Sequence, residues 1–404
     1  MEHYVVVGAG QAGCSLVAKL RALGFEGRIT LIGSEPYPPY QRPPLSKGYL
    51  LGEIERDRLF LRPKSYYDEQ KIELILGKEA LSIDLDNKLV HLEGGQDVPY
   101  DKLAITTGMI PRKLPEEVGG ALAGVHVVRS LSDVDGMAGD MHAGGQLLVV
   151  GGGYIGLEAA AVARKLGLDV TLIEIAPRIL ARVAAEETAD YFRDLHSAQG
   201  VDIREGVGLE RLLGEDRVTG AVLTDGTEVA CDMVIAGIGL LPRCKIADAA
   251  GLEVSNGVKT DEHGQTSDPN VWAAGDCASF PFRGERIRLE SVPNAIEHAE
   301  LVAENMMGGH KAYEPHPWFW SDQYDVKLQI AGLHSGYDRV YVRPGDKDGV
   351  ASHWYFCGAD LVAVDAMNDP RAYMVGKRLL EAGKSPPPEA VTDPGANLKA
   401  LLTA

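Results

Sequence analysis

The sequence predicts an α/β protein with two Rossmann-like dinucleotide-binding domains. The first observation is that two glycine-rich turns each stand between an apolar strand and a helix. The second is an acid at the end of the strand that follows, Glu35 in the first unit and Glu174 in the second. Both turns have the spacing G-x-G-x-x-G, and their glycines are Gly8, Gly10, Gly13, Gly151, Gly153 and Gly156.

The first unit begins with YVVVGAGQAGCSLVAKL, which predicts a strand, a turn and a helix. Gly8 permits the tight turn, Gly10 lets a pyrophosphate approach the backbone, and Gly13 lets the helix pack on the strand. The start of the helix offers free N–H groups and the positive end of its dipole. The next strand, RITLIGSE, ends at Glu35, where a carboxylate can bind a ribose diol.

The second unit, QLLVVGGGYIGLEAAAVARKLGLDVTLIE, repeats this order of elements. Two such units imply two dinucleotides, or one dinucleotide and one flavin. Glu174 should accept a hydrogen bond from a free ribose 2′-hydroxyl and repel a 2′-phosphate, which favours NADH over NADPH. Arg178 and Arg182 lie downstream and weaken this preference slightly, or are ordinary charges on a helix surface.

Three further segments contain glycine at the end of a strand. TSDPNVWAAGDCAS contains the pair Gly275 and Asp276, more than 200 residues after the first turn. LAITTGMIPR and MVIAGIGLLPR lie before and after the second unit. Their glycine regions are interpreted as the points where the chain crosses between an inserted domain and its host, at Thr106, Thr107, Gly108, Gly237, Ile238 and Gly239.

Length and charge exclude several classes of protein. The 404 residues suggest two or three domains. The formal net charge of −18 disfavours binding to nucleic acid or to anionic membranes. The chain shows no long uncharged apolar run and no basic segment ahead of its first strand, so we expect neither a membrane span nor a secretory signal. The predicted location is the cytoplasm.

The five cysteines are scattered and odd in number, and none forms a CxxC pair. This usage is typical of reduced thiols in the cytoplasm, and it lacks the ligand spacing of structural zinc, so no metal site is predicted. Cys14 follows the third glycine of the first turn and is interpreted as a packed core thiol. The five are Cys14, Cys231, Cys244, Cys277 and Cys357.

The segment YPPYQRPPLSKGYL carries four prolines and then reaches Lys47. Proline fixes φ and removes a backbone donor, so this segment, here called the proline arm (residues 37–50), can be neither a helix interior nor a central strand. It is stiff, and ordering it costs less entropy than ordering an ordinary loop. The alternative is a surface linker with a solvated lysine.

Together these motifs resemble the pyridine-nucleotide disulfide reductase superfamily. The resemblance is greater to the NADH-dependent ferredoxin reductases that serve bacterial oxygenases, of the putidaredoxin-reductase and aromatic-dioxygenase-reductase type. It covers nearly the whole chain. The motifs that carry it are the two glycine turns, PYQRPPLSK, VVGGGYIGLEAAA, AGIGLLPR, VWAAGDCA, RLESVPNA and PWFWSDQYDVKLQIAG.

This resemblance implies a glutathione-reductase-like fold with a C-terminal α/β domain that covers the flavin. An FAD domain would span residues 1–109 and 246–316, an NADH domain 110–245, and the C-terminal domain 317–404. FAD would be held without a covalent bond, with Asp276 at its ribityl or pyrophosphate end. The backbone N–H of Val292 would meet the pyrimidine edge of the flavin, although ordinary packing at the start of a helix also explains this residue.

The residues predicted to bind FAD or NADH come from the two turns and from the resemblance. For FAD they are Gly8, Gly10, Ala12, Gly13, Glu35, Arg42, Lys47, Ala80, Thr107, Gly108, Arg129, Asp276 and Val292. For NADH they are Gly151, Gly153, Ile155, Gly156, Glu174 and Gly239.

The absence of a cysteine pair that could face the flavin indicates which acceptor takes the electrons of the flavin. A flavin that reduces a disulfide needs two cysteines facing it, and the proline arm, where one branch of the superfamily carries them, has none. The predicted NADH domain has only Cys231 and Cys244, which do not form the CxxC of another branch. A flavin can also release electrons singly. The resemblance then implies that the acceptor is a [2Fe–2S] ferredoxin. This ferredoxin would supply electrons to an oxygenase of P450 or Rieske type.

An acidic chain would need a local basic patch to dock a commonly acidic ferredoxin. Against such a patch, the helix after SVPNA carries Glu297, Glu300 and Glu304. Solvated surface charge is the alternative for each candidate. The candidates are Arg56, Arg58, Arg62, Lys64, Arg283, Arg286 and Arg288.

Three residues are predicted to act in the reaction. Lys47 and Glu158 would form an ion pair at the junction of nicotinamide and flavin. Glu158 is expected in the first turn of the helix that follows the second glycine turn. A carboxylate there has another explanation, because helix N-termini favour acids. Trp320 would lie at the flavin, whereas Trp318 and Phe319 would belong to the core of the C-terminal domain.

Other functions stay open on sequence grounds. Rubredoxin reductases and monodehydroascorbate reductases use similar scaffolds without cysteines. A flavoprotein of the apoptosis-inducing-factor kind, in which NADH binding switches an interaction surface, is a further alternative. The predicted state is a monomer or a weak dimer, and neither the ferredoxin nor the oxygenase is identified.

Overall fold

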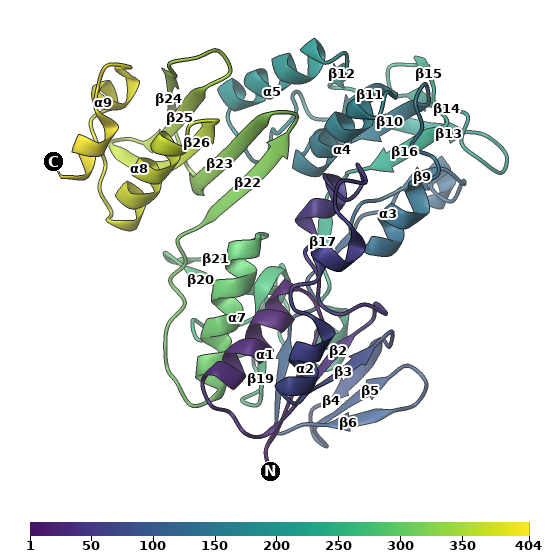
Figure 1. Ribbon diagram of the computed structural model, residues 1–404, viewed down its shortest axis with the longest axis vertical. Coiled ribbons are helices and arrows are strands. Elements are labelled where there is room, and N and C mark those ends of the chain that lie inside the picture. The colour runs from purple at the N-terminus through teal and green to yellow at the C-terminus, as the bar shows by residue number, and fades with distance from the viewer. Residues whose placement is uncertain (404) are drawn as a thin grey trace. The chain divides into compact units, whose positions relative to one another are not determined.

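The computed structural model describes residues 1–403 and divides them into two compact units (Figure 1). The first unit contains residues 1–42, 55–110 and 240–315. The second unit contains residues 43–54, 111–239 and 316–404, of which 404 lies outside the described residues. The proline arm therefore divides at Arg42, and its lysine belongs to the second unit. The division into FAD, NADH and C-terminal domains stays a prediction, because the bound cofactor defines it.

A parallel five-stranded sheet forms the centre of the first unit, in the order β19-β7-β1-β2-β3. Helices α1 and α7 lie side by side next to it (Figure 1). These elements are β1 (His3–Val7), α1 (Gln11–Ala22), β2 (Arg28–Gly33), β3 (Ile72–Leu76), β7 (Lys102–Ile105), β19 (Val271–Ala273) and α7 (Val292–Met306).

Short elements complete the first unit. Two small three-stranded sheets have the orders β4-β5-β6 and β18-β20-β21, and β8 pairs with β17 where the chain passes between the units. The strands are β4 (Ala80–Asp84), β5 (Leu89–Leu92), β6 (Asp97–Pro99), β8 (Met109–Pro111), β17 (Leu240–Pro242), β18 (Val258–Lys259), β20 (Ala278–Phe282) and β21 (Glu285–Ile287). The helices are α2 (Lys64–Glu69), α6 (Lys245–Ala249) and the 3₁₀ helices η2 (Arg56–Leu59) and η4 (Gly275–Cys277).

The second unit repeats the parallel sheet, in the order β12-β11-β10-β16-β9. The chain between β12 and β16 forms a separate antiparallel sheet of order β13-β14-β15. The strands are β9 (Val125–His126), β10 (Gln146–Val150), β11 (Asp169–Glu174), β12 (Asp202–Glu205), β13 (Leu209–Leu213), β14 (Gly220–Leu223), β15 (Glu228–Ala230) and β16 (Met233–Ala236). The helices are α3 (Leu131–Met137), α4 (Tyr154–Lys165), α5 (Glu186–Ala198), η1 (Pro43–Ser46) and η3 (Glu116–Val118).

The C-terminal part of the second unit is an antiparallel sheet of order β22-β23-β26-β25-β24, against which α8 packs. Its strands are β22 (Trp318–Gln323), β23 (Val326–Gly332), β24 (Arg339–Pro344), β25 (Ala351–Cys357) and β26 (Asp360–Met367). Its helices are α8 (Pro370–Glu381), α9 (Pro388–Thr392) and η5 (Leu398–Leu402). The predicted α/β class with two Rossmann-like sheets and a C-terminal α/β part is confirmed.

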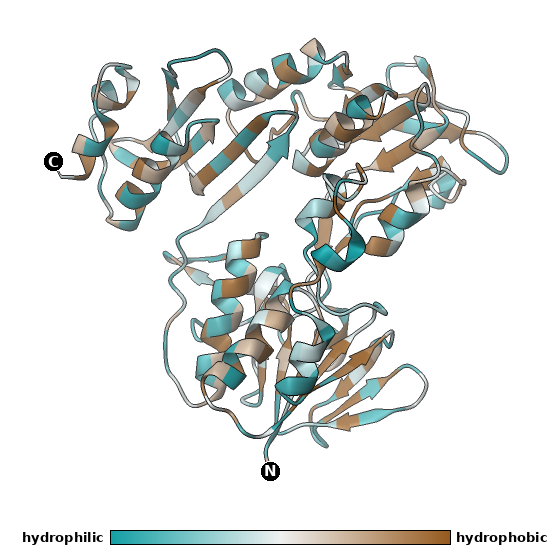
Figure 2. Cartoon of the chain, viewed as in Figure 1, coloured by the Kyte–Doolittle hydropathy of each residue, from teal (hydrophilic) through white to brown (hydrophobic). Residues whose placement is uncertain are grey.

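Burial explains why these strands form where they do. All five residues of β1 are buried, as are four of the five in β10, and after a first polar residue each strand is a run of four mainly apolar residues. Such runs are typical of parallel strands with both faces covered. Figure 2 shows the central strands mainly in brown, whereas β23 alternates between brown and teal. That alternation belongs to a sheet with one covered face.

A buried acid joins α5 to the C-terminal sheet. Asp365 is fully buried and accepts hydrogen bonds from Thr188 Oγ1 at 2.8 Å and from the Tyr355 hydroxyl at 2.5 Å. Its second oxygen lies 2.7 Å from Nε2 of His334. Burial alone would raise the pKa of Asp365, but His334, Tyr355 and Thr188 outweigh it and hold that pKa below its usual value. This network fixes α5 against the strands that follow β22.

One buried histidine makes the stability of the first unit depend on pH. His298 of α7 is fully buried, stacks on Tyr313, and has no hydrogen-bond partner for either ring nitrogen among the described residues. Burial lowers its pKa to about 3, so the ring is neutral in the folded chain. The unfolded chain takes up a proton near the ordinary value of 6.5. This contribution to stability is therefore complete above pH 6.5 and is lost as the pH falls toward 3.

We predict that His298→Phe flattens this dependence, because phenylalanine takes up no proton when the chain unfolds. As the pH falls from 6 to 4, the unfolding free energy of the variant minus that of the unchanged protein should increase by about 1.4 kcal/mol per pH unit. Urea unfolding at several pH values measures it. The exposed His310→Phe is the control and should leave the slope unchanged. Equal slopes for His298→Phe and the unchanged protein would contradict the prediction.

Candidate dinucleotide and redox site

The first glycine turn leaves open the space that a ligand needs and closes the space that packing needs. A Cβ on Gly13 would lie 2.0 Å from the carbonyl oxygen of Gly8, so only glycine lets α1 approach the turn. Gly8 has φ +123° and leaves no room for a side chain against the Thr106 carbonyl, 2.2 Å away. A Cβ on Gly10, by contrast, would meet nothing within 4 Å. That open face at a helix N-terminus fits a pyrophosphate.

The start of α1 carries no competing cap. Gly10 is its N-cap, no side chain caps the first turn, and no acid stands in it. Ala12 is buried at this end of the helix, and a Cβ on Gly275 of η4 would lie 2.9 Å from its Cβ. Asp276 follows Gly275 in η4, and its contact with a flavin stays a prediction. Val292, another predicted ligand, is the first residue of α7.

Glu35 is held in place by two neighbours from the proline arm. Its Oε1 accepts from Arg42 Nη2 at 2.6 Å, and its Oε2 accepts from the Tyr40 hydroxyl at 2.5 Å. Arg42 also donates to that hydroxyl at 2.9 Å and lies over the Tyr40 ring. The structure thus brings the predicted residues Glu35 and Arg42 together. Sequence reasoning missed Tyr40, whose only signal was its place two residues before Arg42.

The second glycine turn likewise has one glycine that close packing requires and one that leaves space for a ligand. A Cβ on Gly156 would lie 2.1 Å from the Gly151 carbonyl oxygen, whereas a Cβ on Gly153 would meet nothing within 4 Å. Gly153 is the N-cap of α4, and no side chain caps the first turn, which contains Ile155. Gly239 has φ +101° and ends the segment after β16. The residues present therefore fit a second dinucleotide.

Glu174 ends β11 with its carboxylate against the second turn. Its Oε2 accepts from the Gly152 N–H at 2.7 Å, and its Oε1 accepts from the Ala176 N–H at 2.8 Å. These two bonds fix the carboxylate beside the glycines, and each oxygen keeps a lone pair for a ribose hydroxyl. A phosphate at this place would face a fixed negative charge.

The predicted ion pair between Lys47 and Glu158 is present. Lys47 Nζ lies 2.7 Å from Glu158 Oε2, and the Ser46 hydroxyl donates to the same oxygen at 2.7 Å. The Ser321 hydroxyl donates to Oε1 at 2.7 Å. Glu158 is 5% exposed, so its charge depends on these donors. The part that the pair plays in catalysis stays a prediction.

The expected place of Glu158 in its helix was wrong. α4 begins at Tyr154, so Glu158 is in the second turn, and no acid lies in the first turn. The effect of the helix dipole falls off within the first turn. A favourable helix end therefore does not explain this carboxylate, whereas its three donors, Ser46, Lys47 and Ser321, do.

The aromatic cluster of β22 divides between two neighbours. Trp318 packs against the core of the C-terminal sheet, as expected. Phe319 was expected in the same core but does not belong to it. Its ring packs instead against Tyr154 at the start of α4, with the two ring centroids 5.1 Å apart. Trp320 is half-buried, with its ring centroid 5.6 Å from that of Trp318. Tyr154, whose hydroxyl is buried without a hydrogen-bond partner among the described residues, was missed by sequence reasoning.

The remaining predicted residues lie at element boundaries. In the first unit, Ala80 begins β4, and Thr107 donates to the Arg243 carbonyl at 2.6 Å beside Gly108, which has φ +66°. In the second unit, Arg129 is half-buried between β9 and α3. The contacts of Ala80 and Arg129 with FAD stay predictions.

The basic patch proposed for docking is reduced by the structure. Arg288 pairs with Glu290 at 2.7 Å, and Arg286 donates to the carbonyls of Thr260 and Ser279. Both side chains thus hold the fold of the first unit. The exposed members of the patch are Arg56, Arg58, Arg62, Lys64 and Arg283.

Acids of α7 are also partly neutralised. Lys19 of α1 lies 3.6 Å from Glu300 and 3.0 Å from Glu304. Glu304 forms a second ion pair with Lys311, which lies in the segment that follows α7. The acidity of this helix is therefore a weaker argument against docking than the sequence suggested.

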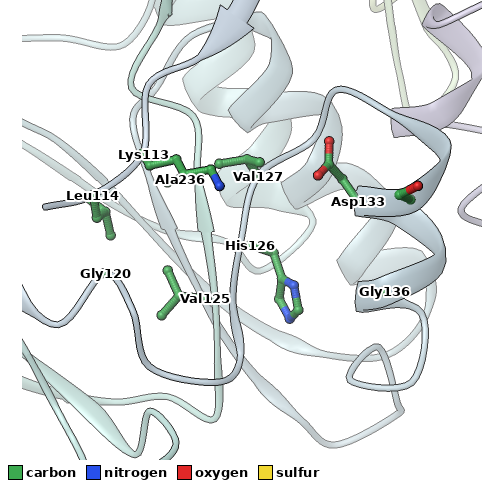
Figure 3. A pocket seen from close by; sticks show the side chains of 10 residues that line it. Lys113, Leu114, Gly120, Val125, His126, Val127, Asp133, Gly136 and Ala236 are labelled. Atoms are coloured by element: carbon green, nitrogen blue, oxygen red, sulfur yellow. The ribbon is translucent and has the colours of Figure 1, made fainter. Parts of the chain in front are cut away.

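A cavity of about 280 Å³ lies elsewhere in the second unit (Figure 3). It is bordered by β9, the start of α3 and the end of β16, and none of the predicted site residues lines it. His126 of β9 lies 2.7 Å from Asp140 through its Nε2 atom. The lining of the cavity includes Lys113, Leu114, Val125, His126, Asp133 and Ala236.

Comparison with known proteins shows the family to which the chain belongs. The family model described as pyridine nucleotide-disulphide oxidoreductase matches residues 2–299, and one described as reductase C-terminal matches residues 318–402. The chain belongs to the pyridine nucleotide-disulphide oxidoreductase family. Several of its relatives in this family are ferredoxin reductases, one is a rubredoxin–NAD⁺ reductase of Ectopseudomonas oleovorans that is 36% identical, and the family uses FAD and NAD(P)H.

Three relatives show how far the similarity extends. A ferredoxin–NAD(P)⁺ reductase of Sphingomonas sp. is 42% identical, covering 99% of this chain and 98% of the relative. The covalent complex of putidaredoxin reductase with putidaredoxin has a reductase chain that superposes with a TM-score of 0.96 at 39% identity, covering 100% and 98% of the two chains. The ferredoxin reductase for the CYP199A2 system of Rhodopseudomonas palustris gives a TM-score of 0.95 at 39% identity, with 99% of each chain covered.

No helix in residues 1–403 is long and apolar enough to cross a membrane. All five cysteines lie within the described residues and are free. Cys14 is buried and 3.4 Å from the Tyr67 hydroxyl, which confirms it as a packed thiol. Burial raises the pKa of Cys14, so it remains a thiol rather than a nucleophilic thiolate.

We predict opposite outcomes for alanine at two glycines of the first turn. Gly10→Ala should keep the thermal stability of the apoprotein but lower its FAD content, because the new methyl group enters only the open ligand space. Gly13→Ala should lower the melting temperature of the apoprotein, because its Cβ meets the Gly8 carbonyl oxygen. Thermal unfolding of apoprotein and flavin absorbance after reconstitution measure both. Normal FAD content in Gly10→Ala would show that the pyrophosphate lies elsewhere.

Proposed function

We propose that this chain is an NADH:ferredoxin oxidoreductase, which passes electrons from NADH through non-covalently bound FAD to a [2Fe–2S] ferredoxin. The ferredoxin in turn supplies an oxygenase of P450 or Rieske type. The observation that carries the proposal is the proline arm. Where a disulfide reductase of this superfamily would carry a cysteine pair, this arm presents Lys47 in an ion pair with Glu158. A flavin in this chain therefore has no thiol acceptor in that segment.

The two glycine turns supply the cofactor sites of the proposal. When bound, FAD would supply the capacity to take a hydride from nicotinamide and to release electrons one at a time. Gly10 and the N-terminus of α1 would bind its pyrophosphate, and Glu35, oriented by Arg42 and Tyr40, would bind its adenosine ribose. Gly153 and the N-terminus of α4 would bind the pyrophosphate of NADH. The FAD domain would be residues 1–109 and 246–316, and the NADH domain 110–245.

Glu174 supports NADH rather than NADPH as the donor. Its carboxylate is fixed by two backbone N–H groups and would face a 2′-phosphate at close range. Such a charge placed beside a phosphate should cost about 1.4–3 kcal/mol, or roughly tenfold to more than a hundredfold in kcat/KM. Arg178 does not oppose this, because its guanidinium donates to the carbonyls of Ala184 and Ala185.

Lys47 and Glu158 are proposed to act where nicotinamide meets flavin. The lysine would stabilise negative charge on the reduced cofactor, while Glu158 balances the lysine and helps to place the nicotinamide. The stiff turn of η1 holds Lys47, because its Nζ also donates to the Pro43 carbonyl at 3.3 Å. Misplacing reacting groups by about 1 Å costs about a hundredfold in rate, so a stiff arm serves hydride transfer.

The proposal includes the cellular setting and the partner surface. Free, scattered cysteines and the use of NADH fit the cytoplasm. The exposed basic side chains between Arg56 and Lys64 would contact an acidic ferredoxin. Trp320 would lie near the flavin and take part in electron transfer. A monomer or weak dimer would suffice for the reaction.

We predict fast NADH-dependent reduction of cytochrome c that requires a [2Fe–2S] ferredoxin. Without ferredoxin, or with rubredoxin in its place, the rate should be at least tenfold lower, and NADPH should give at least tenfold lower kcat/KM. Steady-state assays with each donor and carrier measure this. A preference for rubredoxin would establish the alternative acceptor. Slow turnover with a long-lived charge-transfer complex would instead support an NADH-switched flavoprotein.

We also predict that Lys47→Met slows flavin reduction by NADH at least tenfold while FAD stays bound. The cause is loss of the cation beside the reduced cofactor, together with a buried Glu158 that has lost its partner. Stopped-flow absorbance of the flavin measures the rate. The exposed Lys64→Met is the matched control and should reduce at the normal rate. If Lys47→Met bleached its flavin as fast as the unchanged protein, the arm would be only a scaffold.

A further inference from the structure

A chain of buried polar side chains continues from Glu158 away from Lys47. The Ser321 hydroxyl lies 2.7 Å from Glu158 Oε1, and Gln323 Nε2 lies 3.1 Å from Ser321 Oγ. Gln323 Oε1 lies 2.8 Å from His196 Nε2, and His196 Nδ1 lies 3.3 Å from the Tyr324 hydroxyl. Ser321, Gln323 and His196 are all fully buried. Four hydrogen bonds thus connect β22 and the last turn of α5 to the carboxylate on α4.

The chemistry of the groups gives these bonds a single direction. An ionised carboxylate only accepts, so Ser321 must use its one proton on Glu158. The Ser321 oxygen then accepts from the amide of Gln323. The Gln323 carbonyl oxygen must in turn receive a proton from His196 Nε2. His196 is left with a bare Nδ1 that accepts from Tyr324, and every bond in the chain points toward Glu158.

Burial keeps the direction in place. It lowers the pKa of His196 to about 4, so at neutral pH the ring carries one proton and has a single tautomer. It also raises the pKa of Tyr324, which remains a donor. The opposite direction would turn the Gln323 amide around and make Ser321 donate to it. Ser321 and Glu158, 2.7 Å apart, could then share a proton only if Glu158 were protonated.

We infer that Ser321, Gln323 and His196 are positioning residues that hold the Glu158 carboxylate aligned with Lys47. Ser321 and Gln323 are two residues apart on β22 and so share one face of the strand. Hydrogen bonds aligned in one direction within a buried network strengthen one another. The C-terminal sheet would therefore contribute to the proposed redox site through these side chains. The effect on flavin reduction rests on the proposed function, whereas the direction of the bonds does not.

The direction is tested by NMR on the FAD-bound protein labelled with ¹⁵N-histidine. The His196 signals, identified by their loss in His196→Gln, should show a proton on Nε2 and none on Nδ1, without change between pH 8 and 5.5. In Gln323→Glu the new carboxylate should bring a second proton onto the ring at neutral pH. A proton on Nδ1 alone, or titration of His196 near pH 6.5 in the unchanged protein, would overturn the inference.

The positioning role is tested by stopped-flow reduction of the flavin with NADH. Gln323→Glu, which has nearly the same shape but cannot donate to Ser321, should lower the limiting rate five- to twentyfold. The apparent Kd for NADH should change less than twofold, because no contact with NADH is removed. Ser321→Ala should show the same split, and Ser321→Thr, which keeps the hydroxyl, should recover most of the rate.

Gln199→Glu makes the same charge change at the exposed end of α5 and is the matched control, expected to behave normally. If Gln323→Glu does not fold, Gln323→Met and the serine pair decide the outcome. Normal rates in Ser321→Ala and the Gln323 variants would refute the positioning role and leave the proposed function standing. An unchanged protein that is not reduced by NADH would refute the proposed function, and the NMR result would still decide the direction of the chain.

Discussion

The second unit depends on the ion pair and hydrogen bonds that the buried Glu158 carboxylate makes. It receives hydrogen bonds from two consecutive residues of the proline arm and from Ser321 of the C-terminal sheet. Three segments that are far apart in the sequence therefore meet at one charge. A charge removed from water is stable only while its partners remain, so each segment constrains the position of the others. This explains why the end of the proline arm belongs with the second unit rather than with the first.

The same logic applies to the second buried acid of this unit. Asp365 is held by Thr188 of α5 and by Tyr355 and His334 of the C-terminal part. Glu158 and Asp365 thus anchor the C-terminal sheet to α4 and to α5. Buried polar contacts demand specific geometry, because a missed hydrogen bond costs the full desolvation of the group. A sheet attached in this way can hold side chains such as Ser321 and Gln323 in fixed positions.

The glycine turns impose a different constraint, which is steric rather than electrostatic. Gly13 and Gly156 admit no Cβ because backbone carbonyl oxygens lie within 2.1 Å of its position. Gly10 and Gly153 have free space, which packing does not use. The contrast separates the glycines that the fold needs from those that a ligand needs. It is also the physical reason why the second and third glycines of each G-x-G-x-x-G pattern should respond differently to mutation.

The sequence by itself determined the two Rossmann-like units, the acids Glu35 and Glu174, and the pairing of Lys47 with Glu158. Local patterns suffice for the turns, because strand, glycines and helix follow one another along the chain. The pairing was a hypothesis about the lysine of the proline arm, and the ion pair is present. The tertiary structure alone placed Glu158 in the second turn of α4, moved Phe319 from the C-terminal core to Tyr154, and tied Arg286 and Arg288 to backbone carbonyls. It alone also revealed the chain from Ser321 through Gln323 to His196, whose partners stand 163 and 127 residues apart in the sequence. No local pattern records such contacts, because each is created only when separate strands and helices are packed and their buried polar groups must find partners.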